Sequence, residues 1–202
     1  MKQYLLFVVI AVALGCVSAE SAVYDPERPW RQPGDVIDSI LPMEEYERRF
    51  REGLPRATRL TGGASDRETL VREFLTAVSR GDSVALGTMA VTRAEFAWLV
   101  FPHHLYRGAP YELDPAIVWL QVQAGSAKGQ ARLLERMSGT PLAFGGLDCE
   151  RDTLQVTDGT LRMWGPCRVR YRTPDSTLER RLFGTMVERD GVVKFLGYGN
   201  DF

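Results

Sequence analysis

The sequence predicts an α+β fold in which N-terminal helices pack on a curved antiparallel sheet of about four strands. Two patterns and their order predict it. Through residues 65–139, apolar residues recur at three- and four-residue spacing, which is the period of a helix. After Pro141, apolar and polar residues alternate in segments separated by turn-forming pairs such as Asp158–Gly159, which is typical of a strand meander. Helices that precede such a meander are expected to cover one face of its sheet.

The N-terminus has the organisation of an export signal, over residues 1–19. Lys2 precedes an apolar run of about eleven residues, which matches a signal-peptide core and is shorter than the roughly twenty residues of a membrane span. The four residues ending at Cys16, Ala-Leu-Gly-Cys, resemble the lipobox of bacterial lipoproteins, with the first two exchanged. The alternative is cleavage after Ala19, which discards Cys16. We therefore expect an exported protein of the bacterial cell envelope, either membrane-anchored by lipid or periplasmic or secreted.

The three cysteines are then reduced to two. Because Cys16 is lost or lipidated, Cys149 and Cys167 remain in an oxidising compartment, where paired thiols form disulfides. If Asp158–Gly159 is the centre of a two-residue turn, the two cysteines lie one position out of register. A bulge at Gly165–Pro166 would absorb that offset. The sequence therefore predicts a cross-strand disulfide.

Residues 20–64 are rich in proline and predict an extended tether to the domain at 65–202. One segment of it, residues 42–54, has the spacing of a short amphipathic helix. This helix either docks on its own domain or contacts a partner or a membrane surface. Its apolar residues are Met43, Tyr46, Phe50 and Leu54.

The domain is expected to open with two helices. Ser65 and Glu68 have the spacing of a capping box, which predicts a helix that ends at Gly81. Asp82 then starts a short second helix that runs to about Met89.

Two further helices are expected after them. Thr92 and Glu95 form another capping box, and Pro102 is expected to stop the helix that they start. Asp114–Pro115 combines a cap with a first-turn proline and begins a helix that continues as far as residue 139 unless internal glycines break it. Those glycines are Gly125 and Gly129.

Four strands are expected after Pro141, separated by Asp158–Gly159, Pro174–Asp175 and Asp190–Gly191; they span 142–150, 160–172, 177–189 and 192–198. Alternation in the second strand places Arg168, Arg170 and Arg172 on one face, which we expect to be solvated. The turn at Pro174–Asp175 then sets Glu179 opposite Arg170 and Arg181 opposite Arg168.

The last turn, at Asp190–Gly191, pairs Phe183 with Tyr198 and Thr185 with Leu196. These residues fall on the same face as the arginines, which gives the sheet apolar residues on both sides. An exposed apolar patch of this kind usually marks a contact surface. We expect it to be covered by the helix at 42–54, by a second subunit in a homodimer, or by another protein partner.

Two segments resemble the nuclear transport factor 2-like superfamily, which includes the ketosteroid isomerases and polyketide cyclases. They are the opening helix that ends in Gly-Asp, residues 68–82, and the final strand at 191–198. The resemblance covers residues 65–202 and implies a cone-like, cystatin-like domain whose open end forms an apolar pocket. Residues 102–140 are longer and more helical than a minimal member requires, which changes the expected pocket entrance.

Six side chains are candidates for a ligand pocket near that opening, because large apolar groups line most small-molecule sites. Aromatic residues on apolar helix faces are also the usual content of a hydrophobic core, and both interpretations stay open. His103 and His104 follow a helix and are expected at the surface unless a carboxylate positions one of them as a base. The six candidates are Trp98, Phe101, His104, Tyr106, Trp119 and Phe144.

Several function classes have no support in the sequence. The formal net charge of -1 leaves no overall field for nucleic acid, and the sequence lacks nucleophile-elbow, dinucleotide-binding and phosphate-binding motifs. Neither metal-ligand spacing nor a cofactor motif occurs, so we expect no metal and no cofactor.

The sequence favours a non-catalytic, envelope-tethered domain that binds a small apolar ligand or a protein partner. The alternative is a small cofactor-independent isomerase or lyase acting in the cone cavity. It would need a carboxylate inside that cavity together with a hydroxyl to hold an oxyanion. Asp114 or Asp148 could supply the carboxylate, and the hydroxyl candidates are Tyr106, Tyr111 and Tyr171.

Overall fold

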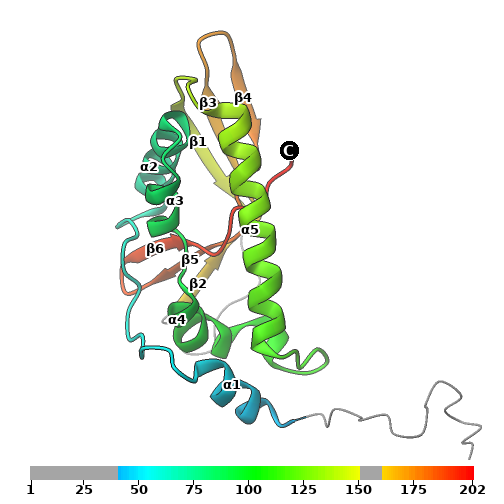
Figure 1. Cartoon of the computed structure of the whole chain (residues 1–202). Coiled ribbons are helices and arrows are strands. Elements are labelled where there is room, and N and C mark those ends of the chain that lie inside the picture. The colour runs from blue at the N-terminus through cyan, green and yellow to red at the C-terminus, as the bar shows by residue number, and fades with distance from the viewer. Residues whose placement is uncertain (1–40, 151–160) are drawn as a thin grey trace, which may run out of the picture. The chain divides into compact units, whose positions relative to one another are not determined.

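Five α-helices and six short strands lie in the part of the chain that the computed structural model describes, residues 41–150 and 161–202 (Figure 1). The helices precede the strands, and the strand pairs are antiparallel, so the predicted α+β class is confirmed. The export signal, Cys16 and the Asp158–Gly159 turn lie outside the described residues, and the predictions about them stay predictions. Among the described helices, none combines the length and the apolar composition that a bilayer span requires.

Helix α1 (Met43–Arg51) is the amphipathic helix expected within residues 42–54, and it packs on its own domain. Phe50 is buried, and its ring meets Phe96 edge to face with centroids 6.1 Å apart. Glu47 is buried too, in ion pairs with two arginines. Of the two roles left open for this helix, the structure shows docking on its own domain.

Helix α2 (Arg67–Arg80) has a different N-cap from the one predicted. The Asp66 carboxylate accepts the Thr69 N–H at 2.8 Å, so the predicted capping box of Ser65 and Glu68 is wrong. An ionised carboxylate is a stronger hydrogen-bond acceptor than the neighbouring hydroxyl, and it takes the cap position. The end of the helix is as predicted, because Gly81 adopts the left-handed conformation with φ 70°.

The short helix predicted from Asp82 to about Met89 is confirmed as α3, whereas the helix predicted after Thr92 is divided into four short helical elements. The capping box of Thr92 and Glu95 is confirmed, but the α-helix that it starts gives way within one turn to a π-helix. Pro102 does not stop the helical path, because it sits in the first turn of a 3-10 helix, where no N–H is needed. The elements are α3 (Ser83–Met89), α4 (Arg93–Glu95), η1 (Phe96–Val100), η2 (Phe101–His103) and η3 (Leu105–Arg107).

Helix α5 (Pro115–Met137) is continuous and forms the longest element in Figure 1. Its cap is as predicted, since the Asp114 carboxylate accepts the Ala116 N–H at 2.7 Å. Neither Gly125 nor Gly129 breaks it. Gly129 has a packing role, because a Cβ atom there would lie 1.7 Å from the carbonyl oxygen of Tyr198.

The strands form two three-stranded sheets, where the sequence predicted one sheet of about four strands. The four predicted strands keep their expected neighbours, but the middle two are each divided: at Gly165–Pro166, and at residues 181–185. Pro166 has no N–H to donate to a strand ladder, which accounts for the first break. One sheet holds β1 (Ala143–Cys149), β3 (Cys167–Arg172) and β4 (Thr177–Arg180), and the other holds β2 (Leu161–Trp164), β5 (Met186–Arg189) and β6 (Val192–Phe195).

The predicted hairpin registers are largely confirmed. Arg170 faces Glu179 and forms an ion pair with it at 3.1 Å. Leu196 donates its N–H to the carbonyl oxygen of Thr185 at 2.8 Å. Asp190 and Gly191 both have positive φ, at 51° and 76°, as a tight hairpin turn requires.

Phe183 and Tyr198 lie in the core, which corrects the predicted exposed patch, whereas Leu196 is half-buried beside the other core cluster. Phe183 and Tyr198 are fully buried, and both rings contact Phe74 of α2, with centroids 5.7 Å and 5.8 Å away. The break at residues 181–185 explains the difference. The alternation of side chains between the two sheet faces is interrupted there, so the face of Phe183 does not follow from the face of the arginines. Phe183 and Tyr198 are therefore covered by a helix of their own domain and not by α1.

The disulfide is confirmed: Cys149 faces Cys167 in the β1–β3 ladder and is bonded to it, with the Cα atoms 4.0 Å apart. The two cysteines are 18 residues apart in the sequence, and cross-linking a loop of that length removes chain entropy worth roughly 3 kcal/mol from the unfolded state.

We therefore expect replacement of both cysteines by serine to lower the free energy of unfolding by about 3 kcal/mol, measured by urea denaturation.

The matching control is the reductant itself. It should destabilise the native chain by about the same amount and leave the double serine variant unchanged. Equal stability of the native chain with and without reductant would contradict a stabilising role for this bond.

Candidate functional site

One hollow on the described part of the chain is a cavity of about 340 Å³ beside α5, which we call the α5 cavity. It lies between α5, the connection from α3 to α4, and the segment after β6. Its volume falls in the lower part of the range of small-molecule sites. The lining residues are Gly87, Ala90, Val91, Thr92, Trp119, Val122, Gln123, Ser126, Ala127, Gln130, Leu196 and Tyr198.

The walls of the α5 cavity are fixed by hydrogen bonds between segments distant in sequence. Val91 donates its N–H to the carbonyl oxygen of Phe195 at 2.8 Å, which attaches the α3–α4 connection to β6. Tyr198 donates its N–H to Ser126 Oγ at 3.2 Å, and its hydroxyl donates to the Leu86 carbonyl at 2.6 Å. The cavity is therefore formed before any ligand arrives, which reduces the entropy cost of binding.

The α5 cavity is uncharged at neutral pH. None of its lining side chains is a carboxylate, an imidazole, an ammonium or a guanidinium group. Burial raises the pKa of the Tyr198 phenol well above its ordinary value, so this group stays protonated. An uncharged cavity with an aromatic wall fits an uncharged ligand, because a buried charge on the ligand would lose its hydration without gaining a partner.

Two glutamines supply the polar side of the cavity. Gln130 donates a long hydrogen bond of 3.4 Å to the Ser83 carbonyl. Gln123 is exposed and makes no hydrogen bond within the described residues, so both its amide donor and its acceptor can meet a ligand.

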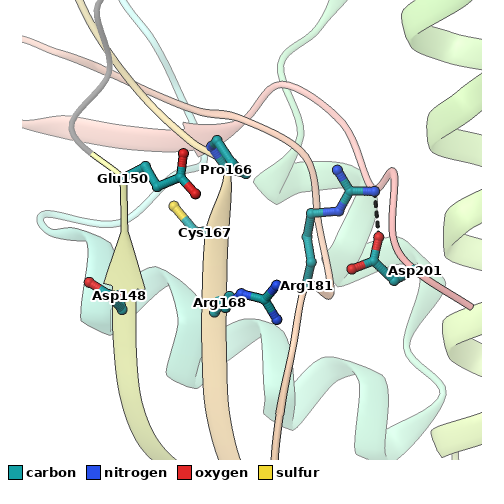
Figure 2. Close-up of a pocket in the computed structure, with 7 residues that line it drawn as sticks. All are labelled: Asp148, Glu150, Pro166, Cys167, Arg168, Arg181 and Asp201. Atoms are coloured by element: carbon teal, nitrogen blue, oxygen red, sulfur yellow. Dashed lines mark ion pairs between the residues drawn. The ribbon is translucent and has the colours of Figure 1, made fainter.

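A second hollow is a polar cleft of about 310 Å³ next to the disulfide, which we call the arginine cleft (Figure 2). Figure 2 shows Arg168 and Arg181 side by side, as the predicted register placed them. Asp201 pairs with Arg181 at 2.5 Å and offsets the repulsion between the two arginines. The other lining residues are Asp148, Glu150, Pro166 and Cys167.

The arginine cleft is a weaker candidate for a ligand site. Its two guanidinium groups face three carboxylates, so neither sign of charge dominates. It belongs to the outer face of the β1–β3–β4 sheet, where Arg168, Arg170 and Arg172 are exposed as predicted. Opposite charges that are already neighbours on a solvated face give a charged ligand little net attraction.

The structure distributes the six predicted pocket residues over different places. Trp119 lines the α5 cavity. Phe101 is fully buried and belongs to an aromatic cluster around Phe96, together with His104 and Tyr106. For this group, the core interpretation is the one that the packing supports.

The remaining two candidates each lie under an arginine. Trp98 is covered by Arg51, whose guanidinium carbon lies 4.6 Å from the ring centroid. Phe144 lies on β1 beneath Arg72, in the other core cluster. Both contacts are cation–π interactions that close the surface over the ring.

His104 does not face either hollow. Its Nδ1 accepts the N–H of Tyr106 at 3.2 Å, and its ring stacks on Phe101 with centroids 6.3 Å apart. Burial lowers the pKa of the imidazole, so His104 is neutral at physiological pH. Its position is that of a side chain that caps the helical turn η3.

The carboxylates proposed for isomerase chemistry lie elsewhere as well. Asp114 caps α5, and Asp148 is exposed in the arginine cleft. Among the hydroxyl candidates, Tyr171 is buried in the core, where burial raises its pKa and the nearby Arg180 partly offsets that effect. No group of three or more potential metal ligands occurs among the described residues.

Sequence reasoning missed most of the α5 cavity. The sequence motifs single out neither Ser126 nor the two glutamines. A signal was present, because residues 115–127 carry no charged side chain although α5 is largely exposed. No known family model, curated protein or solved structure matches this chain.

Proposed function

We propose that this protein is an exported, non-catalytic binding domain that holds a small uncharged ligand in the α5 cavity. The observation that carries the proposal is the lining: a preformed hollow of about 340 Å³ with both apolar and uncharged polar side chains, an amide rim and no charged group. The ligand class that fits has a ring-sized apolar body and one or two hydrogen-bonding groups for the glutamines.

Export and the lipid anchor are part of the proposal and rest on the leader sequence and Cys16. The nuclear transport factor 2-like cone is likewise retained as a proposal, supported by the opening helix and the final strand. The isomerase alternative has less support, because the α5 cavity contains no carboxylate to move a proton.

The direct test is native mass spectrometry of the exported protein, which should show a co-purifying molecule of low mass. The uncharged dye N-phenylnaphthylamine serves as a probe of the same cavity by its fluorescence. We expect Gln123→Phe, at the cavity, to weaken dye binding about tenfold or more, which corresponds to ~1.4 kcal/mol.

The matched control is Gln121→Phe. Gln121 is also an exposed glutamine of α5, two positions away, and does not line the cavity. Its variant should bind the dye like the native chain. Equal dye affinities for the two variants, or no bound molecule in either experiment, would refute the proposed site.

A further inference from the structure

The solvent-facing side of α5 is unusually apolar. Ile117 and Leu120 are 51% and 67% exposed, and they rank among the most exposed large apolar side chains of the described chain. At 100° per residue, they share one helix face that lies opposite the buried residues Val118 and Leu133. We call this face the α5 stripe; it comprises Ile117, Leu120, Gln121, Ala124, Lys128 and Ala131.

The exposed face of α2, the other long helix, differs in composition from the α5 stripe. On α2, arginine and glutamate side chains occupy the exposed positions, including Arg72 and Glu73. The α5 stripe has a single charge, Lys128, over about 21 Å of helix. A solvated helix face normally carries charged and polar residues, so the stripe has the composition of a contact surface.

The α5 stripe is complementary to itself in shape. Its large apolar residues, Ile117 and Leu120, lie in the first half, Ala124 lies at the centre, and Lys128 and Ala131 lie in the second half. If two copies meet antiparallel about a two-fold axis at Ala124, each Ile117 lies over the partner helix at Ala131. The same axis sets Leu120 beside Lys128 of the other copy, whose methylene groups can cover it. Each half of the stripe then meets the opposite half of its copy, as a two-fold symmetric interface requires.

The charges at the two ends of α5 are complementary in the same arrangement. The N-terminal end carries the acidic residues Glu112 and Asp114, and the C-terminal end carries Arg132 and Arg136, which outnumber Glu135. Antiparallel pairing brings the acidic end of one helix to the basic end of the other. Parallel pairing would place like charges together and is disfavoured.

We propose that the occupant of the α5 stripe is a second copy of this chain, packed through an antiparallel α5–α5 contact. One helix face of this length buries less than the roughly 800 Å² per partner of a standard interface. The dimer is therefore expected to be reversible, with a dissociation constant in the micromolar range or weaker. The contact does not depend on the proposed ligand function, because neither Ile117 nor Leu120 lines the α5 cavity.

Sedimentation equilibrium of the full chain, expressed with its leader and with Cys16→Ser to prevent lipidation, tests the proposal. We expect a monomer–dimer equilibrium that Ala124→Glu weakens at least tenfold, since two carboxylates would be buried together on the axis. Val84→Glu is the matched control, because Val84 is 76% exposed on α3 and outside the stripe. It should dimerise like the native chain.

Cross-linking with a short bismaleimide tests the direction of the pairing. Ala124→Cys lies on the proposed axis and should be captured as a dimer, whereas Ala131→Cys is far from its own copy in the antiparallel arrangement. Cys149 and Cys167 are bonded to each other and do not react. Equal capture of the two variants would indicate parallel or random contact and overturn the antiparallel dimer.

Three other results would overturn the proposal. One is a monomer up to roughly millimolar concentration, the weak limit of specific association. Another is a dimer that Ala124→Glu and Val84→Glu affect equally. The third is a monomer that binds phosphatidylcholine vesicles through Leu120, which would assign the stripe to lipid. Dye binding should persist in Ala124→Glu, because Ala124 does not line the α5 cavity, so failure of the dimer and failure of the proposed ligand site are distinguishable.

Discussion

Replacing Lys194 by methionine is expected to lower the free energy of unfolding by about 3–5 kcal/mol. Lys194 is 1% exposed, and its ammonium group lies 2.9 Å from the carboxylate of Glu95, which is also buried. It donates a second hydrogen bond, of 2.6 Å, to the carbonyl oxygen of Thr61. Methionine preserves the bulk of the side chain but leaves the carboxylate buried without its counter-charge. The loss would be a large fraction of the stability of an ordinary domain.

The carboxylate of Glu95 makes this effect large because several segments meet on it. One oxygen accepts the N–H of Thr61 at 2.7 Å, and the other accepts the N–H of Thr92 at 2.8 Å. The ion pair therefore attaches both the chain before α2 and the start of α4 to β6. In the variant, the remaining N–H donors cannot compensate the buried negative charge.

Lys128→Met is the control, since it makes the same lysine-to-methionine change at an exposed position of α5. It should change the free energy of unfolding by no more than about 0.5 kcal/mol, measured by urea denaturation at low protein concentration. If the two methionine variants were equally stable, the Glu95–Lys194 pair would have no structural role.

The same pair predicts a dependence on pH. Burial alone would raise the pKa of Glu95, but hydrogen bonds from Lys194 and from the Thr92 and Thr61 N–H groups outweigh it and lower the pKa. A carboxyl whose pKa is lower in the folded state stabilises the fold above its unfolded pKa of about 4.3. That contribution is lost as the pH falls below this value. Unfolding midpoints of the native chain should drop there more steeply than those of Lys194→Met.

Gly129→Ala is expected to destabilise the chain by about 1–3 kcal/mol or more, although alanine is the better helix former. A Cβ atom at this position would lie 1.7 Å from the Tyr198 oxygen and 2.6 Å from its carbonyl carbon. The neighbour is backbone, so no rotamer change relieves the overlap. The Gly129 carbonyl also accepts a hydrogen bond of 2.9 Å from Asn200, which any shift of the segment would stretch.

Gly125→Ala supplies a control with the opposite sign. It lies one turn earlier in α5, and a Cβ atom there would meet nothing within 4 Å. We expect a gain of about 0.5–1 kcal/mol from helix propensity alone. Thermal unfolding of the two variants measures both effects, and a loss in Gly125→Ala or a gain in Gly129→Ala would contradict the packing of Tyr198 on α5.

Helix starts were predicted correctly where the capping residue interacts with residues close to it in the sequence. Asp82, Thr92 and Asp114 start helices because a side-chain oxygen meets an N–H two or three residues away. The disulfide prediction used the hairpin register, which is a local property, together with the expected export signal. The predicted N-cap was wrong only for α2, where two residues that cap helices well, Ser65 and Asp66, are adjacent.

The candidate site was less predictable, because a cavity is defined by residues from several segments. Trp119 was recognised from its size, but the same rule selected Phe101, which packs into the core. No motif identifies Gln123 as a site residue, because it lines the cavity only together with residues distant in the sequence, Val91 and Leu196. Similarly, nothing near Lys194 in the sequence indicates that its partner is Glu95.

By itself, the sequence determined the class of fold, the order of strand neighbours and the Cys149–Cys167 bond, because periodicity, turns and pairing act over short separations. Only the tertiary structure decided the division into two sheets, the burial of Phe183 and Tyr198, and the position of the α5 cavity. Those depend on how helices and strands pack after the chain breaks at Pro166 and at residues 181–185. Packing joins residues over a hundred positions apart, and no local pattern records which of them will meet.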